Sequence, residues 1–132
     1  ESASVMARHV GQLRDLLRLT DAALRAEQAR MAQCNREISA LQDQLAALKA
    51  PGKAAQATES EPDPAQRAGA DLRWQMWAEE RRKALNLELA KMRAAQDSLR
   101  ASLATAFGKH QATSALCDRE VELRRLKASR DS

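Results

Sequence analysis

The side chains that most often carry catalysis or hold metals are scarce in this sequence and lie far apart. The histidines are His9 and His110 and the cysteines are Cys34 and Cys117, none of them in a nucleophile or zinc motif. Metal binding and acid–base catalysis need several such groups at ligand spacing, and there is no Gly-rich phosphate loop either. The sequence therefore predicts a protein that is not an enzyme and has no metal or cofactor.

Two tryptophans are the first candidates for binding a partner. Trp74 and Trp77 stand three residues apart and share a helical face with Arg81. An exposed aromatic and basic anchor of this kind is typical of protein interfaces. The alternative is that both rings cover the apolar end of a neighbouring helix.

Two basic clusters are the other candidate contact sites. They consist of Arg81, Arg82 and Lys83, and of Arg124, Arg125, Lys127 and Arg130. Either cluster could meet nucleic-acid phosphates, but glutamates just before each one supply ordinary helical charge pairs. We therefore expect contact with an acidic protein surface and no nucleic-acid binding.

The elements that must position these side chains are long helices. Ala, Glu, Lys, Leu and Arg make up more than half of the 132 residues, which is typical of coiled coils. A first helix is predicted over about residues 3–50, with an unbroken heptad. Its position a is taken by Ala3, Val10, Leu17, Leu24, Met31, Ile38 and Leu45, and its position d by Met6, Leu13, Thr20, Glu27, Cys34, Leu41 and Leu48.

A second helix is predicted over about residues 64–128, after a flexible connector at 51–63. Asp63 and Pro64 suit its N-cap and first position. The heptad continues through Leu85, Leu89, Met92, Gln96, Leu99 and Leu103. From Phe107 a four-residue stutter is predicted, with His110, Ser114, Cys117 and Val121 in the new phase. A bend or frayed turn is expected at the adjacent Gly108.

These elements predict an all-α fold in which two long helices form an antiparallel coiled-coil hairpin, as one domain over residues 1–132. A short connection would pair residues whose numbers sum to about 114, bringing His9 near His110 and Cys34 near Glu80, with both cysteines reduced. The second helix would then overrun the first by about sixteen residues at its C-terminal end. Alternatively, two chains could swap their second helices and preserve every seam contact.

The sequence predicts a cytoplasmic localisation for the chain. No apolar stretch approaches the roughly 18 to 20 residues that span a bilayer. The sequence also lacks the basic start and short apolar run of a signal peptide. We therefore expect no direct membrane insertion.

The second helix resembles that of the type III secretion stalk family (FliJ/YscO-like). The likeness is carried by Trp74 and Trp77, by Glu80-Arg81-Arg82 with Leu85, Leu89 and Arg93, and by Ala106-Phe107-Gly108-Lys109. It implies a small cytoplasmic two-helix coiled coil that enters the pore of the hexameric secretion ATPase. It further implies a link from that ring to the export gate in the inner membrane, and contact with export chaperones.

On this resemblance, the partner-binding residues fall into two groups. Trp74, Trp77, Arg81 and Arg82 would face the gate or a chaperone, and Phe107, Val121, Arg124, Arg125 and Lys127 would enter the ring. A generic coiled-coil adaptor or oligomerising scaffold is the main alternative, and a nucleic-acid-binding hairpin is a weaker one. Sequence leaves the oligomeric state open.

Overall fold

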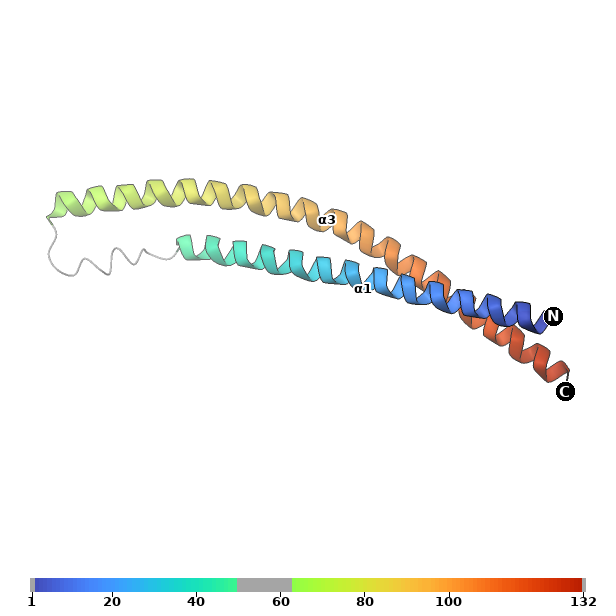
Figure 1. Cartoon of the computed structure of the whole chain (residues 1–132). Helices are drawn as coiled ribbons and strands as arrows, with labels where there is room; N and C mark the ends of the chain where they lie inside the picture. Colours follow the sequence, from blue (N-terminus) through green and yellow to red (C-terminus); the bar gives the residue numbers. More distant parts are fainter. Residues whose placement is uncertain (1, 50–62, 132) are drawn as a thin grey trace. The chain divides into compact units, whose positions relative to one another are not determined.

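The computed structural model describes residues 2–49 and 63–131, which form two helices, α1 (Ser2–Lys49) and α3 (Pro64–Arg130) (Figure 1). Helix accounts for 98% of these described residues and no strand occurs among them, so the fold is all-α. The two helices run antiparallel, which confirms the predicted helical hairpin. Most of the predicted connector, from residue 51 to residue 62, lies outside the described residues.

Both helices begin and end within two residues of the predicted positions. At the start of α3, the Ala65 amide donates to the Asp63 carboxylate at 3.4 Å, so Asp63 is the N-cap, as predicted. Neither helix, over its described length, has a stretch apolar enough to cross a bilayer.

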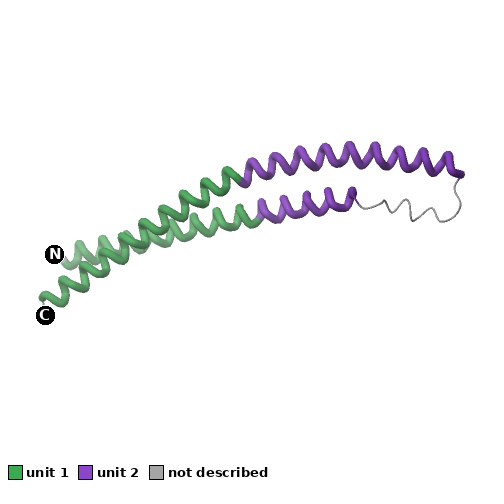
Figure 2. Tube along the Cα trace, turned by 180° about the vertical axis from the view of Figure 1, so that it is seen from behind, with its two compact units in different colours: residues 1–32, 97–132 green, residues 33–96 purple. Residues whose placement is uncertain are grey.

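The helices divide into two compact units (Figure 2). Unit 1 comprises the described residues within 1–32 and 97–132, and unit 2 those within 33–96. Each unit therefore contains one segment of α1 and one segment of α3.

The seam of α1 follows its predicted heptad. From Met6 to Leu48, every residue at positions a and d is buried or half-buried. At the other positions over that length every residue is exposed except the half-buried Asp21. The heptad predicted for α1 is therefore confirmed from Met6 to Leu48, including its polar members Thr20 and Glu27, whereas Ala3, predicted at position a, is exposed.

The seam of α3 keeps one register from Leu85 to Glu120, so the predicted stutter is wrong. With Leu85 at position d and Leu89 at position a, its buried and half-buried residues are Leu85, Leu89, Met92, Gln96, Leu99, Leu103, Ala106, His110, Thr113, Cys117 and Glu120. Ser114, at position e, is half-buried as well. Phe107 and Val121 lie outside this seam at position e, 48% and 42% exposed. The small residue Ala106 and the buried Thr113 keep the spacing instead. The Thr113 hydroxyl donates to the Lys109 carbonyl at 2.8 Å, so its burial leaves no unmet hydrogen bond.

α3 also continues as a helix through Gly108, so no frayed turn occurs there. A single glycine removes side-chain packing and lowers helix propensity, but it does not remove a backbone hydrogen bond. The hydrogen bonds of the surrounding turns are therefore enough to carry the helix across it.

The pairing of the two helices differs from the predicted one. In unit 1, Thr20 pairs with His110 and His9 with Glu120, so the paired numbers sum to 130 and 129 rather than 114. In unit 2, the Cys34 thiol lies 3.6 Å from the Met92 carbonyl, and not near Glu80. Packing of the seam therefore sets the register, and a minimal connection does not.

This register removes the predicted overhang at the C-terminal end of α3. Lys127 Nζ lies 3.8 Å from the sulfur of Met6, so α1 accompanies α3 almost to its end. The excess length of α3 lies in unit 2 instead. There, α1 ends at Lys49, whereas residues 64–73 of α3 are exposed apart from the half-buried Gly69.

Candidate partner-binding surfaces

The two tryptophans form a stacked pair on α3 in unit 2. Their ring centroids are 5.1 Å apart with 34° between the ring planes. Trp74 is half-buried beside the seam, whereas Trp77 is 53% exposed. Leu72 and Met76 nearby are more exposed still, at 58% and 62%. The pair is thus anchored by one ring and presents the other to solvent, as a contact site requires.

The first basic cluster is largely neutralised by its own helix. Arg82 pairs with Glu79 at 2.6 Å, and Lys83 pairs with Glu80 at 3.8 Å, as the helical spacing predicts. Arg81 instead donates to the side-chain amide oxygen of Gln44 on α1, at 3.2 Å. Exposed pairs of this type contribute little to stability. Among the described residues, Arg81 is the member of the cluster whose charge is not paired with a carboxylate.

The second group of predicted residues lies in unit 1, near the end of α3. Arg124, Arg125 and Lys127 are all exposed. Arg125 pairs with Glu122 at 3.8 Å, and Lys127 reaches Met6. Arg124 and Lys127 line one shallow groove together with residues of the first turn of α1. These cations therefore lie on a part of α3 that is paired with α1, and not on a projecting single helix.

Polar side chains occupy the middle of the seam in unit 1. Thr20 Oγ1 donates to the Leu17 carbonyl at 3.0 Å and lies 3.1 Å from His110 Nδ1. The Thr20 hydroxyl is thus within hydrogen-bond distance of both the Leu17 carbonyl and the His110 ring. His110 Nε2 lies 4.0 Å from Asp21, whereas His9 faces Glu120 at 3.9 Å, so the predicted proximity of the two histidines is wrong.

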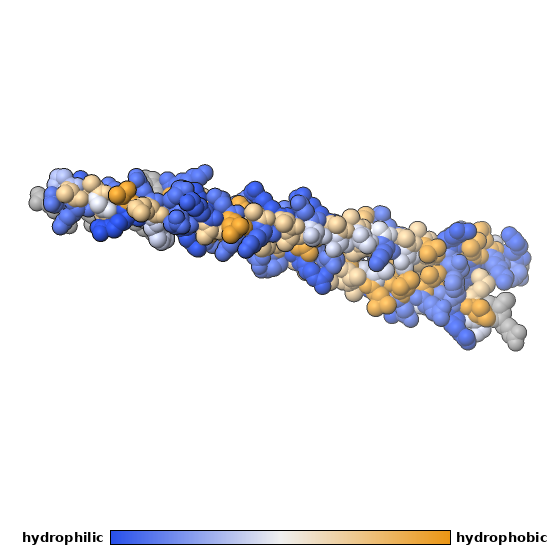
Figure 3. All heavy atoms as spheres, turned by 90° about the horizontal axis from the view of Figure 1, so that it is seen from above, coloured by the Kyte–Doolittle hydropathy of each residue, from blue (hydrophilic) through white to orange (hydrophobic). Residues whose placement is uncertain are grey.

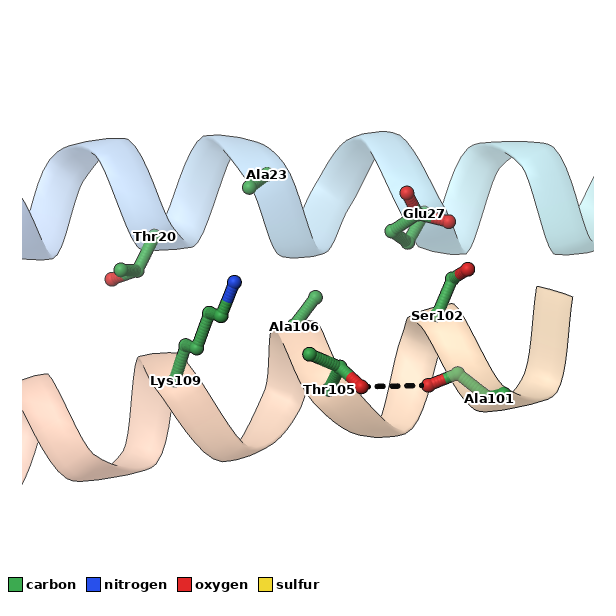
Figure 4. A pocket seen from close by; sticks show the side chains of 8 residues that line it. All are labelled: Thr20, Ala23, Glu27, Ala101, Ser102, Thr105, Ala106 and Lys109. Atoms are coloured by element: carbon green, nitrogen blue, oxygen red, sulfur yellow. Dashed lines mark hydrogen bonds between the residues drawn. The ribbon is translucent and has the colours of Figure 1, made fainter.

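Beside these polar residues the two helices leave a groove of about 440 Å³, lined largely by small side chains (Figure 4). Ala23, Ala101, Ser102, Thr105 and Ala106 form most of its wall, and Thr20, Glu27 and Lys109 complete it.

Two charged side chains line this groove, and neither was a predicted site residue. Glu27 pairs with Arg30 through Oε1 at 2.6 Å, but its Oε2 is buried without a hydrogen-bond partner. The Lys109 side chain extends toward α1 (Figure 4). The sequence did contain one signal for the groove, because Thr20 and Glu27 are the two polar seam positions of α1.

The remaining chemistry-bearing residues do not form a site. Cys34 and Cys117 are free thiols and both are buried, as expected of small apolar residues. Across residues 2–49 and 63–131, no group of three or more His, Cys, Asp or Glu side chains could hold a metal ion.

Comparisons with protein families, with curated proteins and with solved structures found no match for this chain.

Proposed function

We propose that this chain is a non-catalytic central stalk of a bacterial type III secretion system. In this role it binds the pore of the hexameric secretion ATPase and couples the ring to the export gate protein. It would sit on the cytoplasmic side, peripheral to the inner membrane. The proposal rests on the resemblance of the second helix and on the two-helix hairpin fold.

One observation supports the proposal most directly. Trp77 and Phe107, which carry much of the resemblance, are 53% and 48% exposed. Aromatic side chains normally bury most of their large apolar surface. The packing of the hairpin does not account for these two residues, whereas a partner that covers them does.

The paired ends of the helices in unit 1 are the part proposed to enter the ring. Arg124 and Arg125 are exposed there, and Lys127 lies against Met6. A ring lined with acidic groups would attract this end. The tryptophan pair in unit 2 would remain available to the gate protein or to an export chaperone.

The test is ATP hydrolysis by a purified type III secretion ATPase, measured with and without the chain. The wild-type chain should raise the rate, and the double substitution Arg124→Glu with Arg125→Glu should remove the stimulation. A matched control is Lys91→Glu with Arg67→Glu, two exposed cations on α3 in unit 2, which should leave the stimulation in place. Stimulation that survives the first substitution would contradict the assigned end, and absence of both binding and stimulation by the wild type would contradict the function.

A generic coiled-coil adaptor is the second candidate, and exposed apolar side chains in unit 1 favour it. Leu16, Leu19 and Leu116 are 45%, 67% and 49% exposed, more than a free-standing hairpin needs. An adaptor would bind a helical partner and leave the secretion ATPase unbound. A pull-down of the ATPase on the immobilised chain separates the two candidates.

A further inference from the structure

The exposed apolar residues of unit 1 are not scattered at random. Figure 3 shows a face on which apolar side chains gather over this part of the molecule. The described part of unit 1 has eight exposed large apolar residues. Six of them occupy heptad positions c and g, on the flank opposite to Phe107 and Val121. We call these six residues, each between 45% and 67% exposed, the leucine face: Val5, Leu16, Leu19, Leu116, Leu123 and Leu126.

Both helices contribute to one side of the hairpin at these positions. Ala23 on α1 and Lys109 on α3 are position g residues, and they line the same groove. Leu16 and Leu116 lie seven residues from them, two helical turns along the same stripe of each helix. The leucine face therefore continues the groove along the two helices.

At positions c and g of this flank every charged residue is a cation, whereas the adjoining position d holds Glu27 and Glu120. Positions c and g of unit 1 number nine on α1 and ten on α3, and none of these described residues is Asp or Glu. The cations among them include Lys109 and Arg119, neither of which has an ion pair within the described residues. The opposite flank, in contrast, carries Asp21, Asp97 and Asp118.

The cations on this flank favour one of two possible binding partners for the leucine face, a second copy of the chain or an acidic helix of another protein. A second copy of the chain would place cations against cations, which costs interaction energy wherever both are partly desolvated. A helix with carboxylates beside its apolar stripe would place opposite charges together. The groove also has a floor of alanine, serine and threonine, over which another helix backbone can approach closely.

We propose that the leucine face and its groove are the docking site of a third helix, supplied by a partner protein. That helix carries an apolar stripe flanked by Asp and Glu, and a hydrogen-bond donor opposite Glu27. Leu16, Leu116 and Leu123 bury against its stripe, and Lys109 and Arg119 pair with its carboxylates. The site does not depend on a secretion role, because it rests on the burial and charge of unit 1 alone.

The probe is a synthetic, fluorescein-labelled helix of about three heptads, with Leu at a and d and Glu at e and g. A second peptide has Lys in place of every Glu. Fluorescence anisotropy with the full chain should show binding of the acidic peptide and at least tenfold weaker binding of the basic one. Leu116→Glu with Leu123→Glu should weaken binding of the acidic peptide at least tenfold, whereas Leu87→Glu, at a leucine 59% exposed in unit 2, should leave it unchanged.

A charge reversal distinguishes recognition from general stickiness. Lys109→Glu with Arg119→Glu should reverse the preference, so that the basic peptide binds more tightly, while circular dichroism shows unchanged helix content. Equal binding of both peptides, or binding of neither, would overturn the proposal. It would also be overturned if the chain alone were a dimer that Leu116→Glu with Leu123→Glu converts to a monomer, since the occupant would then be a second copy.

Discussion

The fully buried residues of unit 2 are all apolar, although its seam also holds the half-buried Gln96, whereas unit 1 has more polar side chains in its interior. The buried residues of unit 2 are Cys34, Ile38, Leu41, Ala78, Leu85 and Leu89. Unit 1 buries Val10, Leu24 and Cys117, together with the polar Thr113. Its seam also contains Thr20, Glu27 and His110, and a groove opens beside them.

This contrast indicates a division of roles within one pair of helices. Apolar burial is the main source of stability, so unit 2 should hold the hairpin together. Unit 1 keeps small and polar residues in its seam and apolar residues on its outside, the reverse of what stability alone would select. An exposed apolar flank of this kind marks an interaction site.

The largest expected effect is the loss of packing in unit 2. Leu85 is 1% exposed, so Leu85→Ala should lower the free energy of unfolding by about 2 to 5 kcal/mol through lost burial and a residual cavity. Urea denaturation followed by circular dichroism measures it. Leu87→Ala, two residues away but 59% exposed, should change stability by less than about 0.5 kcal/mol. Similar losses for the two variants would refute the assigned seam.

A smaller change in the free energy of unfolding, of opposite sign, is expected when a charged residue in the seam of unit 1 is replaced by an apolar one. Glu27→Leu removes a buried carboxylate oxygen that has no hydrogen-bond partner, and it fills part of the groove. The free energy of unfolding should rise by about 1 to 3 kcal/mol. The control is Glu80→Leu, because the Glu80 side chain is 78% exposed and its replacement should change stability little. If Glu27→Leu destabilises the protein, the polar seam of unit 1 is not a weak point.

The smallest expected effect comes from Gly108 in unit 1. A methyl group added there meets no atom within 4 Å, so Gly108→Ala gains helix propensity without a clash. We expect up to about 1 kcal/mol of stabilisation, seen as a higher thermal midpoint. Gly69→Ala, in the part of α3 that extends past Lys49, should raise the midpoint less. An unchanged or lower midpoint for Gly108→Ala would mean that the glycine has a conformational role.

The sequence predicted the helices and the α1 seam well because large apolar residues repeat there without interruption. On α3 beyond Leu103 it was wrong for Phe107 and Val121, which are exposed, although His110, Ser114 and Cys117 are buried or half-buried. A heptad read from large side chains favours Phe107, whereas the folded seam takes the smaller Ala106 and Thr113. Which of the two phases faces α1 depends on how small residues fit against the opposite helix, and that information is not local.

The register and the leucine face were harder to predict, for related reasons. The pairing is set by packing along the seam, and the assumption of a short connection misplaced it by about sixteen residues in unit 1, which created the false overhang at Lys127. The leucine face becomes visible only when positions c and g of both helices are placed on one side. Its signal in the sequence was the absence of Asp and Glu from those positions.

Hydrogen exchange of the backbone amides tests most directly the claim that unit 2 holds the hairpin and unit 1 is the adaptable part. Exchange from native helices reports the free energy of local opening, which rises with apolar burial. The amides of Leu85 and Leu89 should exchange most slowly, and those from Leu103 to Thr113 should exchange distinctly faster. Equal protection of the two segments, or slower exchange from Leu103 to Thr113, would contradict the account.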